Sequence, residues 1–189
     1  MQNERGEETL ILLKPAWVHA TVTCYGQWLP GDPRGFRTKR HREHVEGDYK
    51  RPPVKDYTGR HRRSRSLLTQ TPVRLAPPHR AVALDMIRER LEFLNVTPAA
   101  IAVAATHVHI YGRFPAGEPR KLLGRAKRNA TERLREIGLG EKVWAKRSRC
   151  EVVETRGHAR NLYAYILRHA EKEGAALYRW KGKRAAGLA

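Results

Sequence analysis

The stretch between Arg37 and Arg65 limits where a hydrophobic core can form in this chain of 189 residues. It contains 11 Lys or Arg and 4 Asp or Glu residues, two adjacent prolines and almost no aliphatic side chains. A segment of this composition cannot bury enough apolar surface to offset the entropy lost on folding. We therefore predict a basic loop insertion at about residues 37–77, either solvated or ordered by nucleic acid, with the core built from the segments on both sides.

Apolar periodicity outside this insertion predicts the regular elements. In residues 17–25, small apolar side chains at the even positions alternate with polar or aromatic side chains at the odd positions. This period of two is typical of a strand with one core face. Residues 101–111 are rich in β-formers and predict two strands with a break near residues 105–106. The other predicted elements are a last strand at 150–153 and helices at about 79–95, 118–137 and 156–173.

The predicted order is strand, basic loop, helix, two strands, helix, strand and helix. A β-α-β-β-α-β core matches the ferredoxin-like fold, an α+β class with an RRM-like antiparallel sheet and crossover helices, and the last helix is added to it. The length supports a single domain, assigned to residues 1–189. We predict a basic tail at about 175–189, in which residues 179–184 form a mobile arm on nucleic acid.

Charge indicates the class of partner. Lys plus Arg number 38 against 19 Asp plus Glu, a formal net charge of +19, and a field this positive calls for a polyanion such as nucleic acid. Because no apolar run reaches about 18 residues, we expect no membrane partner and a cytoplasmic protein. Two cysteines, Cys24 and Cys150, cannot build a disulfide framework, which fits a reducing compartment.

His107 and His109 form the first candidate site. Residues i and i+2 of a strand project to the same face, where two imidazoles can share one divalent ion. With nine histidines in the chain, about 0.4 such pairs arise by chance, so the pair alone favours two partly exposed strand histidines over a metal site.

The last predicted helix carries the second candidate, Tyr165 and His169, which lie four residues apart on one face. Alone, these residues also fit ordinary packing and a surface cation near a helix end. If His107, His109 and His169 held a metal, the Tyr165 hydroxyl would lie one helical turn away from it. A phenol beside an ion-polarised phosphate could then attack and form a phosphotyrosine ester.

Three features taken together resemble the single-tyrosine HUH transposases. They are the His-hydrophobic-His strand, the helical tyrosine followed four places on by a polar residue, and the run Tyr25-Gly-Gln-Trp-Leu-Pro-Gly-Asp-Pro-Arg-Gly35. The resemblance is closest to the REP-associated tyrosine transposases of bacterial chromosomes and covers about residues 16–180. It implies a nucleoid-associated enzyme that acts on single-stranded DNA with a REP-like hairpin. It also implies a Mg²⁺- or Mn²⁺-dependent nick that leaves a 5′-phosphotyrosine and a free 3′-OH.

Carried over by position, the resemblance assigns His107 and His109 as metal ligands and Tyr165 as the nucleophile. The third ligand in this family is often Gln or Asn four residues after the tyrosine, where this chain has His169. Three imidazoles favour softer ions over Mg²⁺, so the choice between Mg²⁺ and Mn²⁺ stays open at this point. A monomer and a homodimer are both compatible with the sequence.

Basic and aromatic residues are assigned to DNA binding, with a merely solubilising basic face and a turn-anchoring aromatic as alternatives. The predicted DNA contacts are Lys121, Arg125, Arg128, Arg147, Arg149 and Trp28, with Phe36 a further candidate for base stacking.

Two other functions stay open. One is a non-catalytic nucleic-acid-binding module that uses the RRM-like sheet for stacking, and the other is a metal-dependent phosphohydrolase with a histidine-activated water. A covalent protein-DNA adduct distinguishes the tyrosine mechanism from both.

Overall fold

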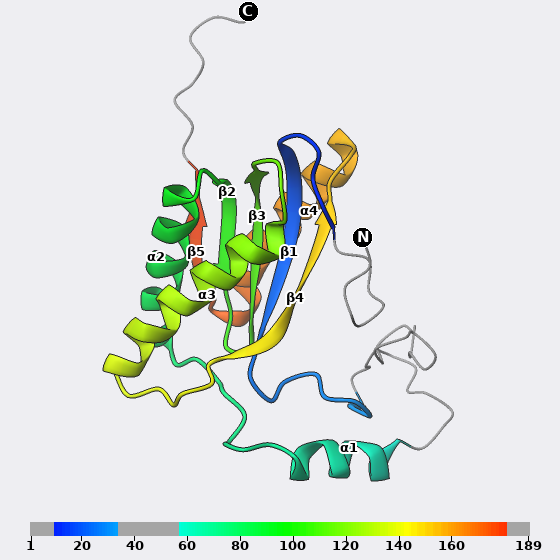
Figure 1. Cartoon of the computed structure of the whole chain (residues 1–189), viewed down its shortest axis with the longest axis vertical. Coiled ribbons are helices and arrows are strands. Elements are labelled where there is room, and N and C mark those ends of the chain that lie inside the picture. The colour runs from blue at the N-terminus through cyan, green and yellow to red at the C-terminus, as the bar shows by residue number, and fades with distance from the viewer. Residues whose placement is uncertain (1–9, 34–56, 181–189) are drawn as a thin grey trace, which may run out of the picture.

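The computed structural model describes residues 10–33 and 57–180. Phe36, residues 37–56 of the predicted basic loop and residues 181–184 of the predicted arm lie outside these ranges. The described elements, in chain order, are β1 (Ala16–Cys24), α1 (Thr58–Ser66), α2 (Pro77–Phe93), β2 (Thr97–Val103), β3 (His107–Phe114), α3 (Pro119–Glu136), β4 (Trp144–Val152), α4 (Arg156–Glu173) and β5 (Ala176–Arg179) (Figure 1).

One antiparallel sheet organises these elements, with the strand order β4-β1-β3-β2-β5. Helices α2 and α3 cover one face of the sheet, and α4 lies on the other (Figure 1). The first four strands and the two crossover helices confirm the predicted ferredoxin-like α+β fold, and α4 is the added helix. Among the described residues, no helix combines the length and the apolar character needed to cross a membrane.

The period of two along the strands determines what each face of the sheet contacts. Val18, Ala20 and Val22 of β1 are buried in the larger core, together with apolar residues of α2 and α3. The alternate residues of β2 and β3 point to the other face, where residues such as Ala102 and Tyr111 form a second core with Ile166 of α4. His107 and His109 share the parity of Tyr111, so they face α4.

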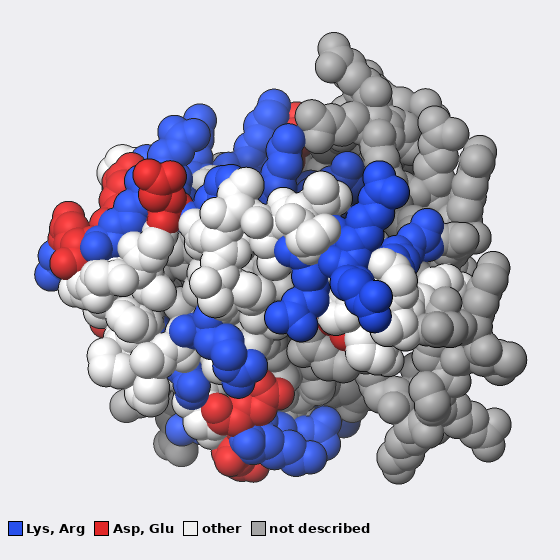
Figure 2. Space-filling model, turned by 90° about the horizontal axis from the view of Figure 1, so that it is seen from below, with Lys and Arg blue, Asp and Glu red and all other residues white. Residues whose placement is uncertain are grey.

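Helix α1 lies inside the stretch predicted as a loop, which corrects the prediction for residues 58–66. None of its residues is buried, so it has no apolar stripe by which periodicity could reveal it. Its four arginines are good helix formers, and the segment contains no proline. In the view from below (Figure 2), Lys and Arg side chains gather right of centre, where α1 runs in Figure 1.

Two further differences concern strands. β5 forms within the predicted tail and pairs with β2, with Tyr178 opposite Ile101, so Arg179 belongs to the sheet rather than to an arm. β4 begins at Trp144 instead of residue 150. Its exposed basic side chains hide the alternation in which Trp144 and Ser148 are buried, and strand pairing with β1 decides its length.

Candidate metal and tyrosine site

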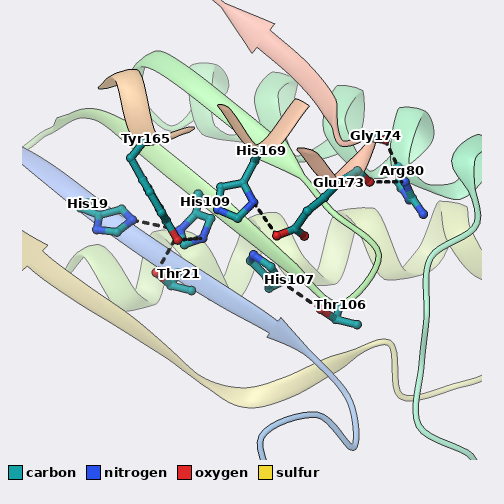
Figure 3. A network of polar contacts seen from close by, with 10 residues as sticks. All are labelled: His19, Thr21, Arg80, Thr106, His107, His109, Tyr165, His169, Glu173 and Gly174. Atoms are coloured by element: carbon teal, nitrogen blue, oxygen red, sulfur yellow. Dashed lines mark hydrogen bonds and ion pairs between the residues drawn. The ribbon is translucent and has the colours of Figure 1, made fainter. Parts of the chain in front are cut away.

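Three histidines from β3 and α4 converge on one face of the sheet (Figure 3). His107, His109 and His169 each offer one ring nitrogen, and these atoms all lie within 4.8 Å of one another. The His169 ring centroid is 5.1 Å from that of His107 and 4.8 Å from that of His109. Residues about 60 positions apart in the sequence therefore form a group that could hold a metal ion.

The register of α4 brings His169 and Tyr165 to this point. Leu162 and Ile166 are buried against the sheet, and His169 continues their helical stripe. Thr155 caps the start of the helix, where its Oγ1 accepts a hydrogen bond from the backbone N–H of His158 at 3.1 Å.

The other end of α4 is tied to α2. Gly174 ends the helix in the left-handed conformation, with φ of 58°. Arg80 of α2 donates from its Nη1 to the carbonyl oxygens of Gly174 at 2.8 Å and Glu173 at 3.2 Å (Figure 3). Its Nε donates to the carbonyl oxygen of Leu75 at 2.8 Å, which ties the last turn of α4 to the main body of the fold.

The Tyr165 hydroxyl lies beside the histidines. Its oxygen is 3.4 Å from Nε2 of His109, and the residue is 41% exposed, so the tyrosine borders both the site and solvent. A single Nε2 atom can contact the hydroxyl or bind an ion, but not both at once. Tyr163, two positions earlier, packs against the second core instead.

Burial keeps the strand histidines neutral. It lowers the pKa of His107 and of His19 below the ordinary histidine value, and it lowers the pKa of His109 to about 2. Nearby imidazoles add to the effect on His109, because a second positive charge there is unfavourable. A neutral imidazole has the lone pair that a metal ion requires.

His169 provides the test of whether these residues fit a metal. It is 9% exposed, and neither ring nitrogen has a hydrogen-bond partner among the described residues. Nδ1 is 3.1 Å from Oε1 of Glu173, close enough for an ion pair but without hydrogen-bond geometry. A buried polar atom without a partner is costly, so this side chain is suited to bind an ion beside the strand histidines.

Residues of the neighbouring segments orient the strand histidines, and the sequence alone did not assign them this role. Nδ1 of His109 is 3.1 Å from Nε2 of His19 and 3.4 Å from Oγ1 of Thr21, both on β1. Nδ1 of His107 is 3.1 Å from Oγ1 of Thr106. Such contacts at Nδ1 leave Nε2 to the site. Strand alternation assigns His19 and Thr21 to one face of β1, but nothing in the sequence indicates that His109 is the residue they contact.

The predicted DNA contacts separate into two groups. Arg149 lies opposite Thr21 on the face of the sheet that carries the site, and Arg147 is exposed two residues earlier on β4. Three residues of α3, which covers the other face, are exposed and do not approach the site: Lys121, Arg125 and Arg128. Lys121 also forms an ion pair with Glu118 at 2.8 Å.

Trp28 lies in the turn after β1 and is not part of the histidine group. It is 40% exposed and adopts a positive φ of 54°. Its role in stacking on bases stays a prediction.

Comparison with solved structures identifies a similar fold. It belongs to a structure described as the REP-associated tyrosine transposase bound to a REP hairpin, with a TM-score of 0.53 and 15% sequence identity. The match covers 89% of this chain and 74% of that chain. No protein-family profile matches the sequence, and no curated protein matches it. At this identity the likeness is one of fold, and it confirms the structural resemblance to REP-associated tyrosine transposases that the sequence indicated.

Proposed function

We propose that this protein is a metal-dependent single-stranded DNA endonuclease and strand transferase that uses Tyr165 as its nucleophile. The observation that carries the proposal is the position of the Tyr165 hydroxyl beside a three-histidine group on one face of a ferredoxin-like sheet. The similar fold of a REP-associated tyrosine transposase supports it. That structure is described as bound to a REP hairpin, and we propose a hairpin-bearing single strand as the substrate here as well.

His107, His109 and His169 would hold the metal, which we propose to be Mn²⁺ or Mg²⁺. When bound, a divalent ion supplies positive charge that polarises the scissile phosphate. The two strand histidines suit this role because they are neutral at neutral pH. The contacts at Nδ1 also hold their imidazole rings in place.

Tyr165 would supply the reacting oxygen. Its oxygen forms a bond to phosphorus while the bond from phosphorus to the 3′ oxygen breaks. The phenolic proton is released to solvent, and the departing 3′ oxygen takes up a proton, so the products are a 5′-phosphotyrosine and a free 3′-OH. Water does not attack phosphorus in this step, so the phosphotyrosine ester remains intact. A DNA 3′-OH can then attack the ester and rejoin the strands.

The open part of the same sheet face offers a path for the single strand. Helix α4 packs against β2, β3 and β5, while Arg147 and Arg149 lie on β4 at the other edge. Trp17 of β1 is 37% exposed and contacts Tyr111, with ring centroids 5.0 Å apart. Arginines for phosphates and an exposed indole for a base are the elements of single-strand binding.

The deciding experiment is a search for the covalent intermediate. The protein is incubated with Mn²⁺ and single-stranded hairpin DNA from the flanks of its own gene, and the products are separated under denaturing conditions. We expect a protein-DNA complex that survives denaturation and maps by mass spectrometry to Tyr165. Nicked DNA without an adduct would identify a phosphohydrolase, and bound but intact DNA would identify a non-catalytic module.

A further inference from the structure

The arginines of α1 are not part of the site described above. Four of the nine residues of this helix are arginine, none is acidic, and all four arginines are exposed: Arg60, Arg62, Arg63 and Arg65. Arginines three positions apart repel each other on one helix. A helix this short is also marginal by itself, because isolated helices need about 12–15 residues to form in water. Something other than its own sequence must therefore hold it in place.

The turn after β1 provides that support. Ser64 Oγ donates a hydrogen bond to the carbonyl oxygen of Pro30 at 3.0 Å. A Cβ atom on Gly31 would lie 2.5 Å from the backbone nitrogen of His61, so only glycine allows the helix to approach this closely. The docked side of α1 thus contains His61 and Ser64, which are half-buried, and the arginines occupy the remaining sides.

Backbone hydrogen bonds of the segments on either side of α1 place the helix at the end of the sheet where β3 begins. The segment after α1 bonds to this end, with the N–H of Leu75 donating to the carbonyl oxygen of Ala105 at 2.7 Å. The N–H of Cys24, the last residue of β1, donates to the carbonyl oxygen of Thr106, which precedes His107. Helix α1 and the start of β3, whose first residue is His107, therefore belong to one end of the molecule (Figure 1).

We propose that α1 binds the phosphate backbone of a duplex DNA stem and holds it at this end of the sheet, so that the adjoining single strand reaches Tyr165. This inference rests on the proposed function, which requires a strand next to a hairpin. It also gives a role to the turn at Pro30 and Gly31, which is the platform on which α1 docks.

The composition of α1 favours a duplex over other polyanions. A single strand is usually bound through aromatic side chains, and α1 contains no Phe, Tyr or Trp. A membrane-surface helix needs an apolar face, which α1 lacks. A straight rod of nine residues, about 13 Å long, that presents arginines on several sides suits a rigid, regular array of phosphates.

The test measures the salt dependence of DNA binding. All proteins carry Tyr165→Phe so that no DNA is cut, and binding is followed by fluorescence anisotropy. One probe is a hairpin with a stem of about ten base pairs, roughly one turn of B-DNA, and a single-stranded extension. The other probe is the extension alone.

Arg62→Gln with Arg63→Gln removes two charges from α1. The matched control, Arg156→Gln with Arg160→Gln, removes two exposed charges from the first turns of α4, which begins after the far end of β4.

We expect the α1 variant to make the negative slope of log K against log salt shallower by about 1.8 on the hairpin, at about 0.9 per phosphate contact. The slope on the extension should stay unchanged. The control should change neither slope. Equal losses on both probes, or equal losses in the two variants, would overturn the assignment to a duplex stem. Binding of the α1 variant to the hairpin at the unchanged slope would overturn it as well.

A second variant separates the position of the helix from its charge. Gly31→Ala keeps every arginine but displaces α1, because a Cβ atom at φ of +85° meets the backbone of His61. The same fall in slope on the hairpin is expected, whereas wild-type binding would contradict a role for the platform. These measurements do not depend on cleavage. Absence of a covalent adduct in the wild type would defeat the proposed function, and an unchanged slope would defeat only the role of α1.

Discussion

The hydroxyl oxygen of Tyr165 lies 3.4 Å from Nε2 of His109, although the two residues are 56 positions apart in the sequence. This contact joins α4 to the central strand of the sheet. It places the hydroxyl that we propose as the nucleophile beside nitrogen atoms that could hold a metal, and it makes the site testable residue by residue.

Replacing Tyr165 by Phe should abolish the covalent complex and leave DNA binding near the wild-type level, because only the attacking oxygen is removed. The matched control is Tyr163→Phe, which changes a residue that packs against the second core and should react at close to the wild-type rate. Denaturing gels and anisotropy measure the two effects. Loss of the adduct in the Tyr163 variant alone would show that the nucleophile has been misassigned.

Replacing His107 by Ala should weaken Mn²⁺ binding by at least about 10–100-fold and remove cleavage, because ligands and their supporting residues contribute at least this much to metal affinity. Titration calorimetry on the metal-free protein measures the affinity. His158→Ala, which removes a histidine from the first turn of α4, is the control and should bind Mn²⁺ normally. Cleavage that continues undiminished in EDTA would contradict metal dependence.

Substituting Gln for His169 should raise activity with Mg²⁺ relative to Mn²⁺. A neutral amide oxygen suits the harder ion better than an imidazole nitrogen does, and residue 169 faces both strand histidines. The ratio of initial rates in the two metals is the measurement. If the ratio does not change while Mn²⁺ affinity stays at the wild-type level, His169 is not a ligand.

Arg80→Gln should loosen the last turn of α4 by removing the donors to Leu75, Glu173 and Gly174. We expect a loss of about 1 kcal/mol in the free energy of unfolding, a modest value because the bonds to α4 are exposed to solvent. The rate of adduct formation should fall more than DNA affinity. Arg74→Gln, an exposed change just before α2, should affect neither, and an equal effect of both variants would argue against the tether.

The two basic groups on opposite faces should respond differently to the length of the DNA. Arg147→Gln with Arg149→Gln should lower the salt slope on a short single strand by about 1.4, at about 0.7 per contact. The same change in charge at Arg125 and Arg128 should do so only with DNA long enough to pass around the sheet edge. If the α3 variant shows the larger loss on the short strand, the path proposed along β4 is wrong.

Much of the site was predictable because the information is local. The period of two assigns His107 and His109 to one face from neighbouring residues alone, and helical spacing groups Tyr165 with His169. The cap at Thr155 and the stop at Gly174 are equally local. The order of the elements then restricted the topology to the ferredoxin-like arrangement that is observed.

Only the tertiary structure decided which distant residues meet. The contact between His19 and His109 depends on the register of β1 against β3, and the tether from Arg80 depends on how α2 docks beside α4. Helix α1 has no buried residue, so its existence reflects docking on the turn at Gly31 rather than its own pattern. Periodicity records which side of an element is apolar, whereas the choice of partner is determined by the packing free energy of the whole fold.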